Sequence, residues 1–121
     1  MYLDGQRSGR VEIRQDGAPE GDRLGFTLLS CGEGTAGSYV PLACVAEVKP
    51  GANPSSTGIR VSVDRSPLGG PSDAGLALFM GSYDMDLTVP PGTPAGPMVL
   101  TFTVTDREGR RATQTATFMV R

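Results

Sequence analysis

Apolar and polar residues alternate with a period of two along most of the chain. The clearest run places Met98, Leu100, Phe102 and Val104 on one face, with Val99 and a row of threonines on the other. Such alternation is typical of a strand that buries one of its faces, and long helical periodicity is absent from the sequence. The pattern therefore predicts an all-β chain.

The same alternation predicts seven or eight short strands, which clusters of Gly, Pro, Asn, Asp and Ser separate. Antiparallel strands of this length bury one face each, so two sheets must pack together. We expect residues 1–121 to form a single domain, a sandwich of two antiparallel sheets, with a partly closed barrel as the alternative. The expected strand regions are 11–14, 24–29, 40–48, 59–64, 76–80, 84–89, 98–105 and 112–120.

The last third of the chain carries a recognisable order of motifs, DLTVPPGTPAGPMVLTFTVTDREGRRATQTATFMV, over Asp86–Val120. It resembles the closing strands of bacterial extracellular immunoglobulin-like and fibronectin-type modules. Those modules follow a strand with Val-Pro, Gly-Thr-Pro-Ala-Gly, a Thr-rich strand, an Asp-x-x-Gly turn and a second Thr-rich strand. The resemblance implies an immunoglobulin-like sandwich that serves as a spacer, an adhesion unit or a ligand-binding unit.

The sequence departs from this family pattern directly after Gly96. Pro97 and Met98 stand there, whereas an aromatic residue commonly follows at this distance. A tyrosine-corner hydrogen bond is therefore not expected, although a Met side chain can fill the same apolar space.

The two cysteines, Cys31 and Cys44, form an even pair in a Gly- and Thr-rich β chain. This usage favours a disulfide made in an oxidising compartment, and two buried free thiols are the alternative. A disulfide between Cys31 and Cys44 would close a loop of nearly 15 residues, and for a loop of that length the chain-entropy model gives roughly 3 kcal/mol of stabilisation. Such a bridge would be a local clamp, because the spacing is too short for the inter-sheet bridge of antibody domains.

Charge and hydropathy exclude several classes of protein. The formal net charge is -2, so nucleic-acid binding has no electrostatic support. No apolar run approaches the roughly 18 residues of a membrane-spanning helix. The first residues lack a charged leader followed by an apolar stretch and do not predict a signal peptide; a mature or excised extracellular domain would share this feature.

Catalytic chemistry also finds little support in the residue types present. The chain has no His, which removes Ser/His/Asp and Cys/His nucleophile systems and the commonest general base at neutral pH. The single Lys, Lys49, lies in a Pro- and Gly-rich segment beside no Ser motif, and two cysteines alone cannot complete a zinc site. Paired carboxylates would suit a glycosidase, but the chain lacks the aromatic cleft that such an enzyme needs. We predict no enzyme activity and no required cofactor.

Calcium is the one metal that the sequence makes a candidate. Asp84 and Asp86 lie two residues apart and so project from the same face of a strand, and Asp106 begins a predicted hairpin turn. Hard oxygen ligands at loop ends suit calcium if they converge. The alternative is a solvated strand face and an ordinary turn.

Two tyrosines and the strand edges are the candidate binding features. Tyr39 and Tyr83 flank predicted loops and combine a flat ring with a hydroxyl, as a glycan-binding residue does, although packing at the edge of the core is the alternative. An unprotected strand edge would suit pairing with a partner strand. Arg110, Arg111 and Arg121 are the charges expected to cap such edges.

Together these features predict a non-catalytic extracellular immunoglobulin-like module of a bacterial secreted or cell-surface protein, acting as a structural spacer, an adhesion unit or a binding domain. Its partner would be a protein or glycan at a cell surface, or a neighbouring domain of the parent protein. A carbohydrate- or surface-binding module is one alternative. A small secreted inhibitor is another, because a disulfide would pre-organise the loop at residues 32–38 for binding.

Overall fold

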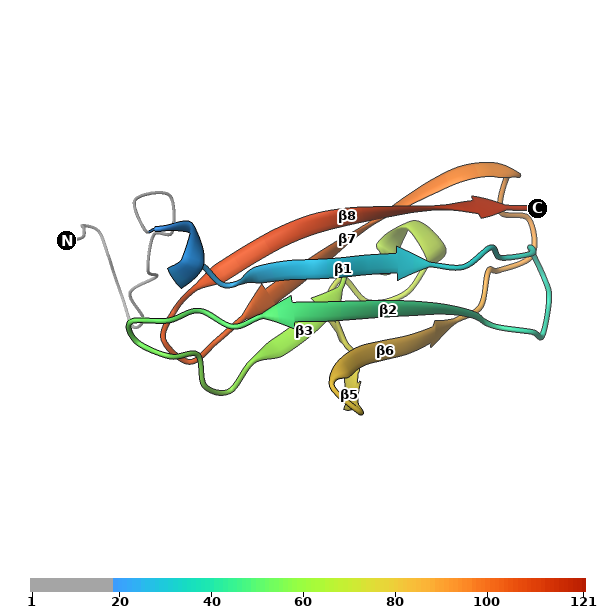
Figure 1. Ribbon diagram of the computed structural model, residues 1–121. Helices are drawn as coiled ribbons and strands as arrows, with labels where there is room; N and C mark the ends of the chain where they lie inside the picture. Colours follow the sequence, from blue (N-terminus) through green and yellow to red (C-terminus); the bar gives the residue numbers. More distant parts are fainter. Residues whose placement is uncertain (1–18) are drawn as a thin grey trace.

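Residues 19–121, which the computed structural model describes, form two antiparallel β-sheets packed face to face (Figure 1). One sheet has the strand order β1-β2-β6-β5, and the other has the order β4-β3-β7-β8. The elements are η1 (Glu20–Asp22), β1 (Gly25–Cys31), β2 (Leu42–Lys49), β3 (Arg60–Val63), η2 (Ser66–Leu68), β4 (Ala74–Gly75), β5 (Ala77–Phe79), β6 (Ser82–Leu87), β7 (Gly96–Thr105) and β8 (Arg111–Val120), where η marks a short 3-10 helix.

The strand order is that of an immunoglobulin sandwich. Strands β1, β2, β6 and β5 correspond to the ABED sheet, and β3, β7 and β8 correspond to the CFG sheet, with β4 added beside the C strand. A parallel bridge between Gly34 and Val120 joins the segment after β1 to the end of β8. The structure therefore confirms the predicted all-β immunoglobulin-like sandwich, with eight strands in the described part of the chain.

Two of the predicted strand regions differ from the structure. Val40, expected on the inner face of a strand, is 76% exposed, because its N–H bonds to the Ser38 hydroxyl and the strand begins only at Leu42, after Pro41. The region 76–80 is divided between two sheets, since the N–H of Leu76 bonds to Val61 where the chain passes from β4 to β5. The predicted strand at 11–14 lies outside the described residues.

The core lies between the inner faces of β2 and β7. Leu100, Phe102 and Val104 of β7 are fully buried, as their alternation with threonines predicts. They meet inner-face residues of β2, including Cys44 and Ala46, in two adjoining clusters. Burial of each such Leu or Phe side chain contributes about 2 kcal/mol, so this layer holds the two sheets together.

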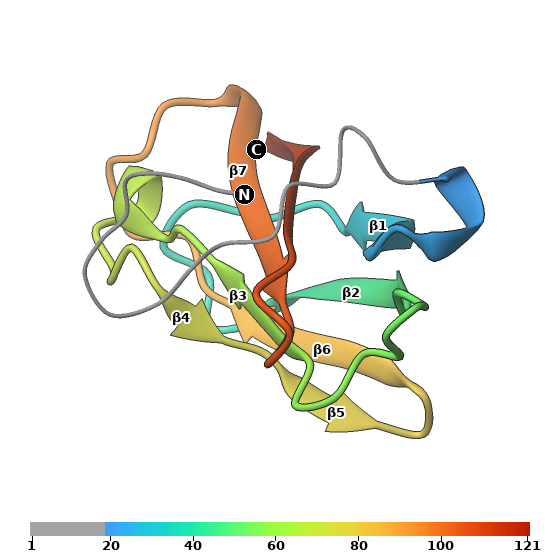
Figure 2. The ribbon, with the colours of Figure 1, turned by 90° about the vertical axis from the view of Figure 1, so that its left-hand side faces the viewer.

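The two ends of the sandwich carry different loops (Figure 1). The β7–β8 turn, the β2–β3 loop and η1 lie at one end, and the β1–β2 loop and the β6–β7 connection lie at the other. Figure 2 shows β4 and β5 following one another along one side of the sandwich. No helix in the described part of the chain has the length and apolar character needed to cross a membrane.

Candidate functional site

A disulfide between Cys31 and Cys44 closes the base of the β1–β2 loop. The two residues are direct cross-strand partners in β1 and β2, with Cα atoms 4.0 Å apart. The bridge therefore lies within one sheet, as the short spacing predicts, and does not join the two sheets. The Cys44 side chain is 1% exposed, so one half of the bond belongs to the core.

Backbone hydrogen bonds hold the loop that the disulfide closes against the rest of the sandwich. The N–H of Gly34 donates to the carbonyl of Met119 at 3.0 Å, and the N–H of Arg121 donates back to Gly34 at 2.9 Å. Further along the loop, the N–H of Gly37 donates to the carbonyl of Val89 at 2.8 Å. The loop is thus anchored to β8 and to the segment after β6, and its backbone is largely fixed before any partner arrives.

The outermost part of this loop presents Tyr39 and Val40, which we name the Tyr39–Val40 tip. Tyr39 is 99% exposed and Val40 is 76% exposed. Ser38 fixes the backbone beside them, since its N–H donates to the Thr35 carbonyl and its hydroxyl accepts the N–H of Val40, both at 3.0 Å. An exposed aromatic on an anchored loop offers contact area with little ordering left to do on binding.

Tyr83, the second tyrosine predicted to bind a ligand, lies in a different environment. It stands in β6 between Ala46 of β2 and Leu78 of β5, on the inner face of the sheet. Its half-buried side chain packs against the cluster that contains Val61 and Val104. The structure therefore does not bring Tyr39 and Tyr83 together in one patch.

The three aspartates considered for calcium are also not gathered. Asp84 and Asp86 project from the outer face of β6, opposite Val45 and Ala43 of β2, whereas Asp106 is buried in the β7–β8 turn. Within residues 19–121, no group of three or more His, Cys, Asp or Glu side chains is arranged to hold a metal ion. Calcium binding at these residues stays a prediction.

Asp106 and Arg110 instead form a buried ion pair at the base of the β7–β8 turn. The Nε of Arg110 donates to Oδ2 of Asp106 at 2.8 Å, and each residue is 4% exposed. The carboxylate also accepts the backbone N–H of Arg110 at 2.9 Å and the Ser56 hydroxyl at 2.7 Å. Burial alone would raise the pKa of Asp106, but these hydrogen bonds and the guanidinium charge hold it below its ordinary value.

The Arg110 guanidinium also ties the β2–β3 loop to this turn. It donates to the carbonyls of Ala52, at 3.0 Å, and of Pro54. Gly51 lies directly against the guanidinium, since a Cβ added there would stand 2.5 Å from Cζ of Arg110. The sequence suggested that Arg110 caps a strand edge. The structure shows instead that its side chain is buried, because it bonds to Asp106 and to the loop carbonyls.

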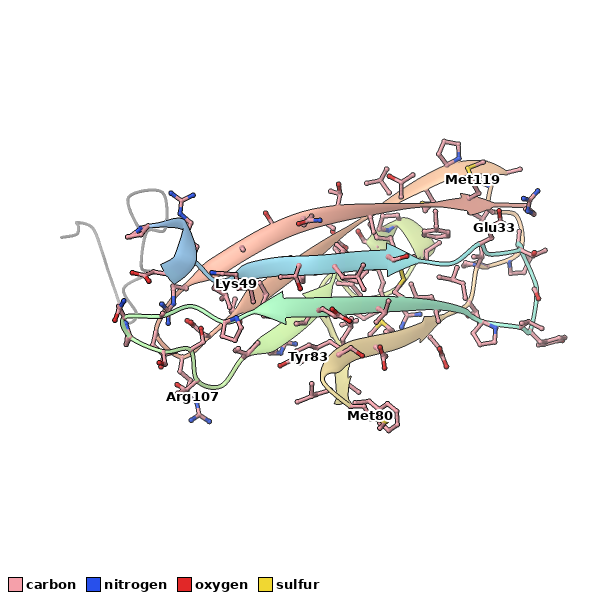
Figure 3. The ribbon with its side chains drawn as sticks, viewed as in Figure 1. Glu33, Lys49, Met80, Tyr83, Arg107 and Met119 are labelled. Atoms are coloured by element: carbon pink, nitrogen blue, oxygen red, sulfur yellow. A yellow bond between two sulfur atoms is a disulfide. The ribbon has the colours of Figure 1, made fainter. Side chains whose placement is uncertain are left out.

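Two carboxylates, Glu33 and Glu108, support the loops at opposite ends of the sandwich. Figure 3 shows Glu33 and, next to Glu108 in the sequence, Arg107. Glu33 accepts two 2.9 Å hydrogen bonds from Arg121, and this hydrogen-bonded cation lowers the pKa of Glu33. Glu108 accepts the side-chain and backbone donors of Thr57, which lower the pKa of Glu108. Each contact joins two segments that are far apart in the sequence and adjacent in space.

Sequence reasoning singled out Tyr39 beside a loop, but it missed the Asp106–Arg110 pair and the exposure of Val40. The i,i+4 acid–base spacing in the DREGR segment is a signal for the pair, but such spacing is common in turns and does not indicate burial. For the tip, the alternation from Val40 to Val48 pointed to a strand, and only the proline after Val40 marks the break. The sequence indicated directly the cysteine pair and the hairpin turn that begins at Asp106.

Comparison with solved structures finds the same fold in titin. The chain is 18% identical to the titin domains Z1Z2 in complex with telethonin, with a TM-score of 0.51, over 81% of this chain and 47% of the titin chain. It is 20% identical to a chimeric titin Z1Z2-Z1Z2 tandem carrying an exogenous fibronectin peptide, with a TM-score of 0.51, over 83% of this chain and 50% of that one. The likeness is one of fold.

This chain spans about half the length of the titin chains that it matches. No protein-family model matches the sequence, and no curated protein does so either.

Proposed function

We propose that this chain is a non-catalytic, extracellular immunoglobulin-like module of a bacterial secreted or cell-surface protein, and that it binds a protein partner through the Tyr39–Val40 tip. The observation that carries the proposal is a nearly fully exposed tyrosine held on a loop that a disulfide and backbone hydrogen bonds fix in place. The bacterial assignment rests on the resemblance of residues 86–120. The disulfide supports an oxidising compartment.

The chemistry of the tip suits a protein contact. A tyrosine ring supplies a large contact area and a hydroxyl with only two side-chain torsions to order, which is why tyrosine is enriched among residues that dominate binding energy. Val40 adds exposed apolar surface directly beside it. Because the loop backbone is anchored, the entropic cost of ordering it has already been met within the fold.

The arrangement of the strands also supports an architectural role in a longer protein. Strand β1 begins at one end of the sandwich and β8 finishes at the opposite end (Figure 1). A module of this kind would separate its neighbours by its own length and hold the tip at the end where β8 finishes. The titin Z1Z2 structure was solved in complex with telethonin, so this fold presents binding surfaces in at least one other protein.

Site-specific photo-crosslinking tests the proposal. A variant carrying p-benzoylphenylalanine in place of Tyr39 is added to the extracellular fraction of the source culture and irradiated. We expect one protein adduct that excess wild-type module suppresses and that excess Tyr39→Ala does not. The matched control carries the crosslinker at Arg107, an exposed position at the opposite end of the sandwich (Figure 3). No adduct, or the same adduct from both positions, would overturn the proposal.

A carbohydrate-binding module is the second candidate, because the exposed ring of Tyr39 also suits stacking on a sugar. Retention on immobilised glycans that Tyr39→Ala abolishes would favour it. A small secreted inhibitor is the third, supported by the disulfide-closed loop at residues 32–43. Inhibition of a protease that is lost when the disulfide is reduced would favour that function instead.

A further inference from the structure

We propose that the free edge of β5 is a second docking surface, which takes an extended basic segment of a protein partner as an added strand. This surface lies on the side of the sandwich, away from the Tyr39–Val40 tip, and goes beyond the function proposed above. An edge strand has a row of backbone N–H and C=O groups without sheet partners, and these can pair with another chain.

The side chains of β5 are unusually apolar for an exposed edge. Leu78 is 62% exposed and Phe79 is 64% exposed. Met80, at the tip of the β5–β6 hairpin in Figure 3, is 89% exposed. Natural sheets usually protect such an edge with a Lys, a Pro or a bulge, and β5 has none of these.

The other edges of the described sheets are protected. Strands β1 and β8 lie side by side, so each shields the edge of the other (Figure 1). The register of β1 also shifts between Phe26 and Leu28, as at a β-bulge. Strand β4 is only two residues long, and its neighbour Asp73 is paired with Arg60 at 2.9 Å. The β5 edge therefore combines exposure and apolar character in a way that the other edges do not.

The hairpin that carries β5 closes through a two-residue turn of defined geometry. Met80 and Gly81 have φ angles of 51° and 88°, which match the two central residues of a type I′ turn. This turn matches the twist of the flanking strands and fixes the pairing of Phe79 with Ser82 and of Ala77 with Asp84. The free edge of β5 is thus held in strand geometry without a partner.

Charge indicates which kind of segment fits beside β5. The four strands of this sheet contain three carboxylates, on Glu47, Asp84 and Asp86, and one cation, Lys49. Lys49 lies at the far end of β2 and donates to the backbone carbonyls of Gly21 and Arg23. The outer face of the sheet beside β5 therefore carries carboxylates that attract a basic partner.

The carboxylate of Asp84 can be reached from an added strand. Asp84 lies directly opposite Ala77, whose side chain is a single methyl group. An added strand would lie about 10 Å from β6, a gap that a Lys or Arg side chain and a carboxylate span together. Phe79 lies on the same face, two residues from Ala77, so its ring offers a second contact to a guanidinium.

A second copy of this chain is the less favourable occupant. Antiparallel pairing of β5 with its own copy would place only Ala77, Leu78 and Phe79 of the second molecule at this edge, so no cation would face Asp84. An extended segment in which Arg or Lys alternates with apolar residues complements the side chains on both faces of β5. Its basic side chains face Asp84, and its apolar side chains pack beside Leu78.

Binding of a synthetic peptide tests this inference. A fluorescein-labelled, acetylated Arg-Val-Arg-Val-Arg-Val peptide is titrated with the protein, and its anisotropy is measured at low salt. We expect saturable binding that the Asp84→Asn/Asp86→Asn double variant weakens roughly tenfold and that about 0.5 M salt also weakens. The corresponding Glu-Val peptide should not bind.

Three controls separate the inference from simple charge attraction and from the tip. The Glu33→Gln variant removes a carboxylate at the end of the sandwich and should leave the affinity unchanged. A peptide N-methylated on alternate residues cannot form the ladder and should not bind. Tyr39→Ala should bind the peptide normally, so loss of the crosslink at the tip and loss of peptide binding are independent results.

Several outcomes would overturn the β5 assignment. They are no binding of the Arg-Val peptide, undiminished binding to the Asp84→Asn/Asp86→Asn variant, and undiminished binding of the N-methylated peptide. A dimer in sedimentation experiments that Leu78→Lys dissociates would also overturn it, because the occupant would then be a second copy.

Discussion

The Nε of Arg110 donates a 2.8 Å hydrogen bond to the carboxylate of Asp106 four residues earlier, and both side chains are buried where the β2–β3 loop meets the β7–β8 turn. The same guanidinium bonds to the Ala52 and Pro54 carbonyls. One side chain thus neutralises a buried carboxylate and satisfies loop carbonyls that come from a distant part of the sequence.

Removal of Arg110 should be strongly destabilising. Arg110→Met leaves Asp106 buried without its cation and leaves the loop carbonyls without a donor, so we expect the free energy of unfolding to fall by about 3–5 kcal/mol. Urea denaturation measures the loss. The matched control is Arg60→Met, which breaks the exposed 2.9 Å pair with Asp73 and should cost less than about 1 kcal/mol. Equal losses in the two variants would contradict the role of burial.

The stability of the protein should depend on Asp106 at acid pH. Hydrogen bonds from Ser56 and Arg110, with the guanidinium charge, outweigh burial and hold the pKa of Asp106 below its ordinary value in the folded state. A lowered folded pKa stabilises the fold above the unfolded value, and this contribution is lost as the pH falls through the folded value. We therefore expect the urea concentration at the midpoint of unfolding to decrease as the pH is lowered from about 5 to about 2. The decrease should be less steep in Asp106→Asn.

The acid response of the variant should not be completely flat. Hydrogen bonds or ion pairs also lower the pKa values of four other carboxylates that are less buried than Asp106, on Glu33, Asp64, Asp73 and Glu108. If the wild type and Asp106→Asn gave parallel curves of midpoint against pH, the buried carboxylate would not be the group responsible.

The period-two alternation was enough to predict the core of this fold. Leu100, Phe102 and Val104 were predicted on one face because a strand that buries one side must place apolar residues at every second position. Strand β5 gave no such signal, since all three of its residues are exposed and nothing constrains their alternation. Its place at a sheet edge depends on pairing with β6, which the sequence pattern does not record.

The sequence indicated the disulfide and named Tyr39 as a candidate, but it did not indicate how the loop presents that residue. Two cysteines in one short segment indicated the clamp, whereas the exposure of Tyr39 depends on how the loop between them is anchored to β8. The ion pair of Asp106 with Arg110 was hidden for a related reason. Its burial comes from the β2–β3 loop, which lies more than fifty residues earlier in the sequence.

Gly51 should not tolerate a side chain. A Cβ at this position would lie 2.5 Å from Cζ and Nη1 of Arg110, and the guanidinium cannot move away without losing its buried hydrogen bonds. We expect Gly51→Ala to lower the free energy of unfolding by about 2 kcal/mol, measured by urea denaturation. Gly21→Ala is the control, because nothing lies within 4 Å of a Cβ there. A neutral Gly51→Ala would mean that the guanidinium is more loosely held than its contacts indicate.

The disulfide should contribute measurably to stability. The bond between Cys31 and Cys44 joins residues 13 apart, for which the loop-closure model gives roughly 3 kcal/mol. We expect the free energy of unfolding of the Cys31→Ala/Cys44→Ala variant, measured by urea denaturation, to be lower by roughly 3 kcal/mol. Thiol titration of the wild type under non-reducing, denaturing conditions should find no free thiol, and two free thiols would contradict both the bond and the extracellular proposal.

The two tyrosines should respond differently to truncation. Tyr83 packs against the core beside Ala46, so we expect Tyr83→Ala to lower the free energy of unfolding by about 2 kcal/mol. Tyr39 is 99% exposed, and Tyr39→Ala should change stability by less than about 0.5 kcal/mol. Calorimetric melting of both variants makes the comparison. A large loss in Tyr39→Ala would mean that the ring supports the loop rather than being free to bind.

The parallel bridge between Gly34 and Val120 has a mechanical consequence. When the chain is pulled from the start of β1 and the end of β8, the hydrogen bonds that join Gly34 to β8 are loaded along the strand direction and resist together. After they break, the disulfide still withholds residues 32–43 from the stretched chain, which shortens its full extension by roughly 40 Å. The bond that shapes the Tyr39–Val40 tip therefore also limits how far this module lengthens under tension.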